Sequence, residues 1–320
     1  MKVTVVVRTF NRPAFLKECL ASVACQTHTD WEVLLFDDGA GIANFEIYKK
    51  FKEQHSDNRI VYITSDTPYE MFQQSWLYSP ELATGDIMVR LDDDDLLTKD
   101  ALKYISDLYE RNPELDFSYG SAFGFEDGKL IEVINTQSPA EVPPTRNMWV
   151  GYTIPNNHPW RNPYCWWQDY YEKPRLYTSI IHCSKTNIMC VFHLYTMRTK
   201  SVKVVKDKIT VTSKYADDLE FFGSLDYLGL AHTAIHKVLT YFRKHDYGRV
   251  TDIVCDSEGL TIVDAVTAIR DKVDYLRPAG FQSRIIPIDM NDNLNDGVTT
   301  EASAKFDEYY SEIKSKSLRY

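Results

Sequence analysis

The feature that most constrains the fold is an apolar segment, residues 87–91, that runs directly into four consecutive aspartates. Its aliphatic side chains are typical of a buried strand. Adjacent carboxylates repel one another and are costly to bring near a core unless a cation neutralises them. Alternation along an extended segment would place Asp92 and Asp94 on one side and Asp93 on the other. Asp95 would then lie in the turn beyond.

This acidic cluster has two interpretations. Oxygen ligands at the end of a strand suit Mg²⁺ or Mn²⁺, which often complete their coordination with substrate phosphates and water. The alternative is a solvated acidic loop, or the N-terminal cap of the helix that follows. Because the cluster comes directly after an apolar strand, the metal site is the favoured interpretation.

Three strands in the first hundred residues end in polar segments, at residues 9–12, 37–39 and 92–95. Strands that alternate with helices indicate parallel βαβ units. Ligands of open α/β sheets bind beyond the carboxyl ends of the strands, so the three segments predict one ligand site at one rim. The expected strands are 2–8, 31–36, 60–63 and 87–91, and the expected helices are 14–24, 44–55 and 71–82.

The pattern changes after residue 116. Two apolar segments around a Glu-Asp-Gly turn predict a β-hairpin, and a long aromatic-rich loop follows it. Further on we expect a helix that begins with acidic residues, a strand, and two helices near the C-terminus. The hairpin covers 117–134, the loop 139–175, the acidic helix start 217–222, the strand 234–242 and the last helices 258–276 and 302–313.

Composition narrows the class of protein. The chain has 320 residues, enough for a large core, and a net charge of −10, which argues against general polyanion binding. Its six cysteines form no CxxC pair, and no segment has the length or composition of a signal peptide or a membrane span. These observations predict a soluble, cytoplasmic protein with reduced thiols.

Five segments together resemble the family 2 glycosyltransferases, which are inverting enzymes with a GT-A fold that use nucleotide-sugar donors. The segments are 3–12 (VTVVVRTFNR), 31–39 (WEVLLFDDG), 83–102 (ATGDIMVRLDDDDLLTKDAL), 216–222 (ADDLEFF) and 241–245 (YFRKH). The resemblance implies an α/β fold with a Rossmann-like, mostly parallel central sheet flanked by helices. It further implies a nucleotide-sugar-binding half (1–116), an acceptor-binding and catalytic half (117–250) and a C-terminal helical extension (251–320).

The resemblance also assigns donor-binding roles. Thr9, Phe10 and Arg12 would line the nucleotide pocket, and Asp38 would accept a hydrogen bond from the base. A carboxylate at that position favours a uracil N–H, so the expected donor is a UDP-sugar. Many relatives carry an Arg-Asn pair where this chain has Trp76 and Leu77, a departure that bears on donor identity.

The metal and the chemistry are assigned in the same way. Asp92 and Asp94 would form the DxD pair, with Asp92 and Asp93 on the donor side and Asp94 as direct ligand of Mn²⁺ or Mg²⁺. Asp218 would be the general base, and His245 would contact the metal or the diphosphate. There are structural alternatives for both assignments. Asp218, with Asp217 before it, would cap the N-terminus of a helix, and His245 would be a structural histidine after a strand. Arg8 and Arg90 are expected to form structural ion pairs.

The acceptor side is least defined. Trp166 and Trp167, with Asp217, are candidate acceptor contacts, since aromatic faces stack on sugars or bases. The alternative for the aromatic residues is a loop packed over the core. The surrounding residues 146–208 are rich in Lys and Arg. A glycan or another hydroxyl acceptor is expected, and DNA with a hydroxymethylated base is a second possibility.

The sequence is compatible with two other functions. It is also compatible with a homo-oligomer. A non-catalytic nucleotide-sugar-binding protein would use the same pocket without turnover. A nucleotidyltransferase would share a metal-bound diphosphate, but it predicts a glycine-rich phosphate loop after the first strand, and residues 9–13 contain no glycine.

Overall fold

A computed structural model describes most of the chain. The described residues are 1–39, 41–65, 70–134, 149–150, 180–182, 189–190, 194–212, 217–245, 284–286 and 298–320. Trp166 and Trp167, most of the aromatic-rich loop and the expected helix at 258–276 lie outside them.

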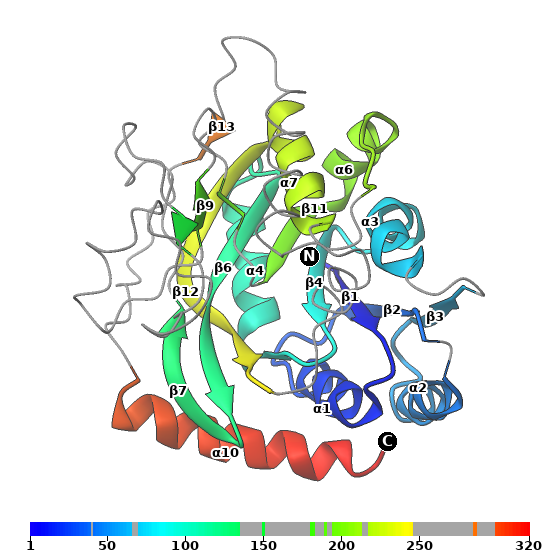
Figure 1. The fold of residues 1–320 in the computed structure, drawn as a ribbon, viewed down its shortest axis with the longest axis vertical. Coiled ribbons are helices and arrows are strands. Elements are labelled where there is room, and N and C mark those ends of the chain that lie inside the picture. The colour runs from blue at the N-terminus through cyan, green and yellow to red at the C-terminus, as the bar shows by residue number, and fades with distance from the viewer. Residues whose placement is uncertain are drawn as a thin grey trace, which may run out of the picture.

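The described residues form a large mixed sheet, a small antiparallel sheet and helices that alternate with the first strands (Figure 1). The strands of the large sheet are β1 (Val3–Thr9), β2 (Trp31–Asp37), β3 (Ile60–Thr64), β4 (Ile87–Asp92), β5 (Leu96–Leu97), β6 (Phe117–Glu126), β7 (Lys129–Ile134), β11 (Tyr195–Arg198), β12 (Ala231–Arg243) and β13 (Arg284–Ile285). The small sheet contains β8 (Trp149–Val150), β9 (Ile180–His182) and β10 (Met189–Cys190). The helices are α1 (Pro13–Ala24), α2 (Ile42–Gln54), α3 (Glu70–Leu82), α4 (Ala101–Arg111), α6 (Thr199–Val205), the 3₁₀ turn η2 (Lys206–Lys208), α7 (Asp217–Tyr227) and α10 (Thr300–Ser317).

The large sheet runs in the order β13-β12-β6-β11-β4-β1-β2-β3. Strands β4, β1, β2 and β3 are parallel neighbours, which confirms the predicted βαβ units. The hairpin predicted after residue 116 is also confirmed, because β6 and β7 pair antiparallel. Strand β11 is among those that the sequence did not predict, and it lies antiparallel between β4 and β6 and joins the two halves of the sheet.

Alternating side chains of the central strands fill two separate cores. In β1, Val5 and Val7 pack in the core that contains α1, α4 and α10, whereas Val6 packs in the core that contains α3, α6 and α7. Burial on both faces explains why this strand is a continuous β-branched run rather than an alternating one. The sheet is therefore sandwiched between two helical layers (Figure 1).

The C-terminal helix α10 is packed into the first of these cores. Phe306 and Ile313 are fully buried there, and the helix lies along α1 and β7 (Figure 1). The predicted division of the chain at residues 116 and 250 is not tested by the structure and stays a prediction. The same holds for a role of the C-terminal extension (251–320) in acceptor binding or in an oligomer contact. In the part of the chain that is described, no helix is both long and apolar enough to cross a membrane.

Candidate functional site

The three polar segments meet at one rim of the sheet, as predicted. In the register of the parallel strands Thr9 pairs with Asp37 and Arg8 with Asp92, so β1, β2 and β4 end side by side. The backbone continues this contact beyond the strands, since the amide of Asp38 donates to the carbonyl of Thr9 at 3.0 Å. The amide of Asp93 donates to the carbonyl of Arg8 at 3.2 Å.

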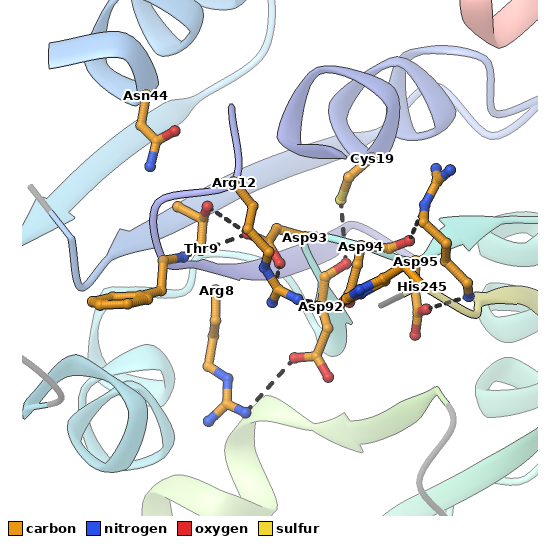
Figure 2. Close-up of polar contacts among 12 residues, drawn as sticks. Arg8, Thr9, Arg12, Cys19, Asn44, Asp92, Asp93, Asp94, Asp95 and His245 are labelled. Carbon is orange, nitrogen blue, oxygen red and sulfur yellow. Dashed lines mark hydrogen bonds and ion pairs between the residues drawn. The ribbon is translucent and has the colours of Figure 1, made fainter. Parts of the chain in front are cut away.

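The acidic segment is a turn rather than an extended strand beyond Asp92. The amide of Asp95 donates to the carbonyl of Asp92 at 3.1 Å, and β4 ends at that residue. Strand alternation therefore stops there, and Asp92 and Asp94 have different partners (Figure 2). Arginines at the rim provide part of the cationic charge that four adjacent carboxylates require.

Asp93 faces the β1–α1 loop. Its fully buried carboxylate accepts hydrogen bonds from Thr9 Oγ1 at 2.6 Å and the amide of Phe10 at 3.4 Å. It also pairs with Arg12 at 2.5 Å. Burial raises the pKa of Asp93 to about 7, with Asp94 contributing and Arg12 opposing. Asp93 thus holds Thr9, Phe10 and Arg12, the predicted residues of the nucleotide pocket, in place.

Asp94 lies beside two cationic or cation-binding groups. Its Oδ2 pairs with Arg12 and is 3.1 Å from Nε2 of His245 (Figure 2). Burial would raise the pKa of Asp94, but His245 and Arg12 hold it below its ordinary value. Among the described residues, no three His, Cys, Asp or Glu side chains converge to hold a metal by themselves.

Such a pair nevertheless suits a hard cation. Mg²⁺ and similar ions in phosphate-transfer sites are commonly held by one or two protein ligands, with substrate phosphates and water as the others. The structure thus brings together Asp94 and His245, the two residues that the sequence nominates as metal ligands, at 3.1 Å. The residues present fit a metal bound jointly with a diphosphate.

Arginines connect Asp92 to the start of α7. Arg90 pairs with Asp92 at 3.0 Å, and Arg8 lies between Asp92, at 3.6 Å, and Asp217. These pairs confirm that Arg8 and Arg90 are in structural ion pairs. Trp76 donates from Nε1 to Asp217 at 2.6 Å, and burial raises the pKa of Asp217 against the opposing effects of Arg90 and Trp76.

Asp218, the predicted base, is the second residue of α7. Its carboxylate accepts a hydrogen bond from Tyr195 Oη at 3.0 Å, and it is partly exposed whereas Asp217 is buried. Both residues lie in the first turn of the helix, where carboxylates favour the helix dipole. Capping and catalysis are therefore compatible at this position.

The end of β2 is ordered by Asp37 rather than by Asp38. Asp37 accepts hydrogen bonds from Asn44 at 3.2 Å and from Tyr62 at 2.6 Å. Asp38, the predicted contact of the base, is buried directly beside the β1–α1 loop. Sequence reasoning missed Asn44 and Tyr62, because nothing in their local pattern distinguishes them from ordinary helix and strand residues.

Two further residues of the site were not predicted. In the sequence Trp76 is only a departure from the family pattern, yet in the structure it contacts Asp217. Arg243 donates from Nε to the carbonyl of Asp94 at 2.9 Å. The sequence feature that could have identified Arg243 is its place in segment 241–245, the last of the five family-like segments, two residues before His245.

Comparison with known proteins extends this description. The profile described as glycosyl transferase family 2 matches residues 4–185, more than half of the chain. The glycosyltransferase GlyA of Streptococcus pneumoniae is 29% identical over 40% of this chain and 18% of its own length. The glucosyl-dolichyl phosphate glucuronosyltransferase of Haloferax volcanii is 29% identical over 36% of each protein. The chain thus spans less than half the length of these relatives.

Solved structures show the same fold. TarS of S. aureus, residues 1–349 in complex with UDP-GlcNAc, superposes with a TM-score of 0.52 at 18% identity, over 78% of this chain and 61% of that one. The mannosyltransferase PcManGT of Pyrobaculum calidifontis, in complex with GDP-Man and Mn²⁺, gives 0.51 at 16% identity, over 84% and 64%. These similarities confirm the expected GT-A fold, and the structure itself contains the C-terminal helix α10.

Proposed function

Because the chain belongs to glycosyl transferase family 2, as its motifs predict, we propose that it is a metal-dependent, inverting glycosyltransferase. It moves a sugar from a nucleotide-sugar, in the first place a UDP-sugar, to an acceptor hydroxyl. The observation that carries the proposal is the approach of His245 Nε2 to Asp94 Oδ2, 3.1 Å apart, at the rim where β1, β2 and β4 end.

Asp94 and His245 are the residues that would hold Mn²⁺ or Mg²⁺. Bound there, the ion would neutralise negative charge on the departing diphosphate. Arg12 already pairs with Asp94, so this guanidinium is a second positive group beside the same carboxylate. Asp92 is turned toward Arg8 and Arg90, and a role for it on the ribose side fits that orientation.

The nucleotide would lie on the β1–β2 side of the rim. Thr9 and Phe10 are fixed there by Asp93, and Asp38 lies next to them at the end of β2. An ionised carboxylate accepts hydrogen bonds and donates none, so Asp38 would favour a base with an N–H at its edge, as uracil has.

Asp218 would act as general base at the other end of the site. In the proposed displacement the acceptor oxygen forms a bond to the anomeric carbon while the bond from that carbon to the diphosphate breaks. The acceptor's proton passes to the Asp218 carboxylate. Asp217, the preceding residue, is tied by Arg8 to Asp92, so the start of α7 is held near the acidic turn.

The first test is donor binding and hydrolysis with UDP-, GDP- and TDP-sugars, in Mn²⁺ and in EDTA. Metal-dependent selection of one UDP-sugar is expected. Asp94→Ala should abolish the metal dependence and most of the transfer. Full transfer with unchanged metal dependence in that variant would overturn the metal assignment.

The second test separates an enzyme from a binding protein. Asp218→Asn should lower kcat by at least about 100-fold and leave donor affinity unchanged, because general base catalysis contributes on that order. Unchanged turnover in this variant would overturn the assignment of the base. A chain that binds donor but shows no turnover with a panel of glycans, or with hydroxymethylated DNA, would support the non-catalytic alternative.

A further inference from the structure

The C-terminal helix α10 is linked to the proposed metal ligands through two buried charged residues, Glu18 and Arg243. We propose that Arg243 is a positioning residue that sets Asp94 and His245 for the metal, and that α10 fixes Arg243 through Glu18. This inference rests on the proposed function, because it assigns a role toward the metal and diphosphate of the same site.

Glu18 of α1 is the point where the C-terminal helix meets the site. Its carboxylate accepts hydrogen bonds from Tyr310 Oη at 3.0 Å and Lys314 Nζ at 2.6 Å, both on α10. On its other side it pairs with Arg243 at 2.7 Å. Burial would raise the pKa of Glu18, but Arg243 and Lys314 hold it below its ordinary value, so Glu18 is a stable anion.

Arg243 transmits this anchoring to the acidic turn. Its Nε donates to the carbonyl of Asp94 at 2.9 Å, and its amide donates to Asp95 Oδ1 at 3.1 Å. The guanidinium carbon lies 4.7 Å from the ring centroid of Phe15 and 4.5 Å from that of Phe125. Two rings and several hydrogen bonds therefore hold this side chain in place.

His245 follows Arg243 by two residues, and its ring lies 4.9 Å from the ring of Phe15. A displacement of Arg243 would therefore act on both proposed ligands. It would move Asp94 through the carbonyl hydrogen bond and His245 through the backbone at the end of β12. Groups that orient metal ligands in this way commonly contribute 10- to 100-fold to metal affinity.

The burial of Glu18 and Arg243 distinguishes this link from a surface ion pair. Their side chains are 8% and 9% exposed, and a buried charge that loses its partner is strongly unfavourable. By contrast, Lys305 and Glu301 on the outer face of α10 are 73% and 77% exposed, and such pairs contribute little. The buried Glu18–Arg243 pair therefore provides the test, and the exposed Lys305–Glu301 pair on α10 provides the matched control.

The decisive variant is Arg243→Lys, which keeps a positive charge for Glu18 but has no Nε donor for the carbonyl of Asp94. Mn²⁺ affinity is measured by calorimetry in the presence of UDP, together with the melting temperature and the donor KM. We expect Mn²⁺ to bind about 10-fold more weakly and donor KM to rise. Lys305→Met should leave both unchanged.

Lys314→Met provides a second readout in case the change at Arg243 prevents folding. It removes one partner of Glu18 near the surface, so the Mn²⁺ dissociation constant should rise by about 10-fold or less, the lower end of the range for groups that orient metal ligands. The titration is made at a temperature well below the melting temperature of the variant. Wild-type Mn²⁺ affinity in both variants would overturn the positioning role and leave the proposed function intact. If the unaltered chain binds neither Mn²⁺ nor UDP, the proposed function itself is overturned, and this inference with it.

Discussion

Trp76 Nε1 donates a 2.6 Å hydrogen bond to Asp217 Oδ2 and so joins α3 to the first residue of α7. The indole stacks on Phe221 of α7, with ring centroids 4.6 Å apart, and Arg90 lies 4.2 Å from its centroid. At the position where the family resemblance leads one to expect arginine, this chain thus has an aromatic residue that contacts the helix of the proposed base.

Trp76→Phe should therefore impair turnover more than donor binding. The variant keeps an aromatic ring against Phe221 but removes the N–H that satisfies the buried carboxylate of Asp217. We expect a loss of about 2 kcal/mol in the free energy of unfolding, because hydrogen bonds to charged groups contribute on that scale. Steady-state kinetics should show a lower kcat with little change in donor KM.

Tyr78→Phe is the matched control for this experiment, since Tyr78 lies on the same helix and is half exposed. It should change neither stability nor kcat. If Trp76→Phe behaves like the control, the hydrogen bond to Asp217 does not position α7.

Glu32 lies at the opposite end of the sheet from the proposed site, and it makes the stability of the protein depend on pH. Its buried carboxylate accepts hydrogen bonds from Thr4 Oγ1 and from the amide of Thr84, both at 2.6 Å. Burial would raise its pKa, but Thr4 and Thr84 outweigh this effect and lower the pKa of Glu32 to about 2. Glu32 therefore joins β1 and β2 to the segment that leads into β4.

The sign of the pH effect follows from this lowered pKa. A carboxyl group whose pKa falls on folding stabilises the native state above its unfolded pKa, which is about 4.3. This contribution, about 3 kcal/mol at neutral pH, is lost as the pH falls toward 2. Urea unfolding of Glu32→Gln should therefore show reduced stability at neutral pH and a smaller difference from the unaltered chain near pH 3. Glu46→Gln is the control, because Glu46 forms an exposed pair with Lys49, and it should show neither effect. If the stability difference between Glu32→Gln and the unaltered chain were the same at all pH values, the lowered pKa assigned to Glu32 would be wrong.

Local sequence patterns were sufficient for the first half of the fold. Strands buried on both faces and the polar segments after them follow from side-chain chemistry over a few residues, and their meeting at one rim follows from parallel pairing. The alternation predicted for the acidic segment stops at Asp92, because the amide of Asp95 closes a turn there.

Long-range contacts could not be predicted in this way. The Trp76–Asp217 bond joins residues 141 positions apart, and the Glu18–Arg243 pair spans 225 positions. No local periodicity carries such information, because these contacts depend on how segments far apart in the chain pack against each other. The predicted acceptor residues Trp166 and Trp167 lie outside the described residues and stay predictions.

Arg12 bridges Asp93 and Asp94, and its removal should make the protein more responsive to divalent ions. Arg12→Met leaves two neighbouring carboxylates without their counter-ion and should cost about 3 kcal/mol of stability. A divalent ion bound at Asp94 would replace part of the lost positive charge. Mn²⁺ should therefore raise the melting temperature of Arg12→Met by more than that of the unaltered chain.

Lys103→Met is the control for charge removal, because Lys103 pairs with Asp107 on the exposed face of α4. Its response to Mn²⁺ should equal that of the unaltered chain. An equal Mn²⁺ shift in Arg12→Met would indicate that the ion binds away from Asp94.

Gly39 and Gly41 differ in how closely they approach the β1–α1 loop, and this difference tests the donor pocket. A Cβ on Gly39 would lie 2.5 Å from Oδ1 of Asn11 and 3.1 Å from its backbone nitrogen, whereas a Cβ on Gly41 would lie 3.5 Å from Oδ1. Asn11 has a left-handed backbone conformation, with φ of 51°, directly between Phe10 and Arg12. Gly39→Ala should displace this loop and weaken donor binding about 10-fold, with a cost of about 1–3 kcal/mol in stability.

Gly41→Ala is the matched control, because its added methyl group makes an ordinary van der Waals contact and should leave donor affinity unchanged. Asn11→Gly provides a rescue: glycine adopts the same positive φ without strain and removes the side chain that collides with the new methyl group. Isothermal titration with UDP should therefore show that Asn11→Gly combined with Gly39→Ala binds more tightly than Gly39→Ala alone. Equal affinities for Gly39→Ala and Gly41→Ala would mean that the β1–α1 loop does not shape the nucleotide pocket, and the donor would then have to be placed elsewhere on the rim.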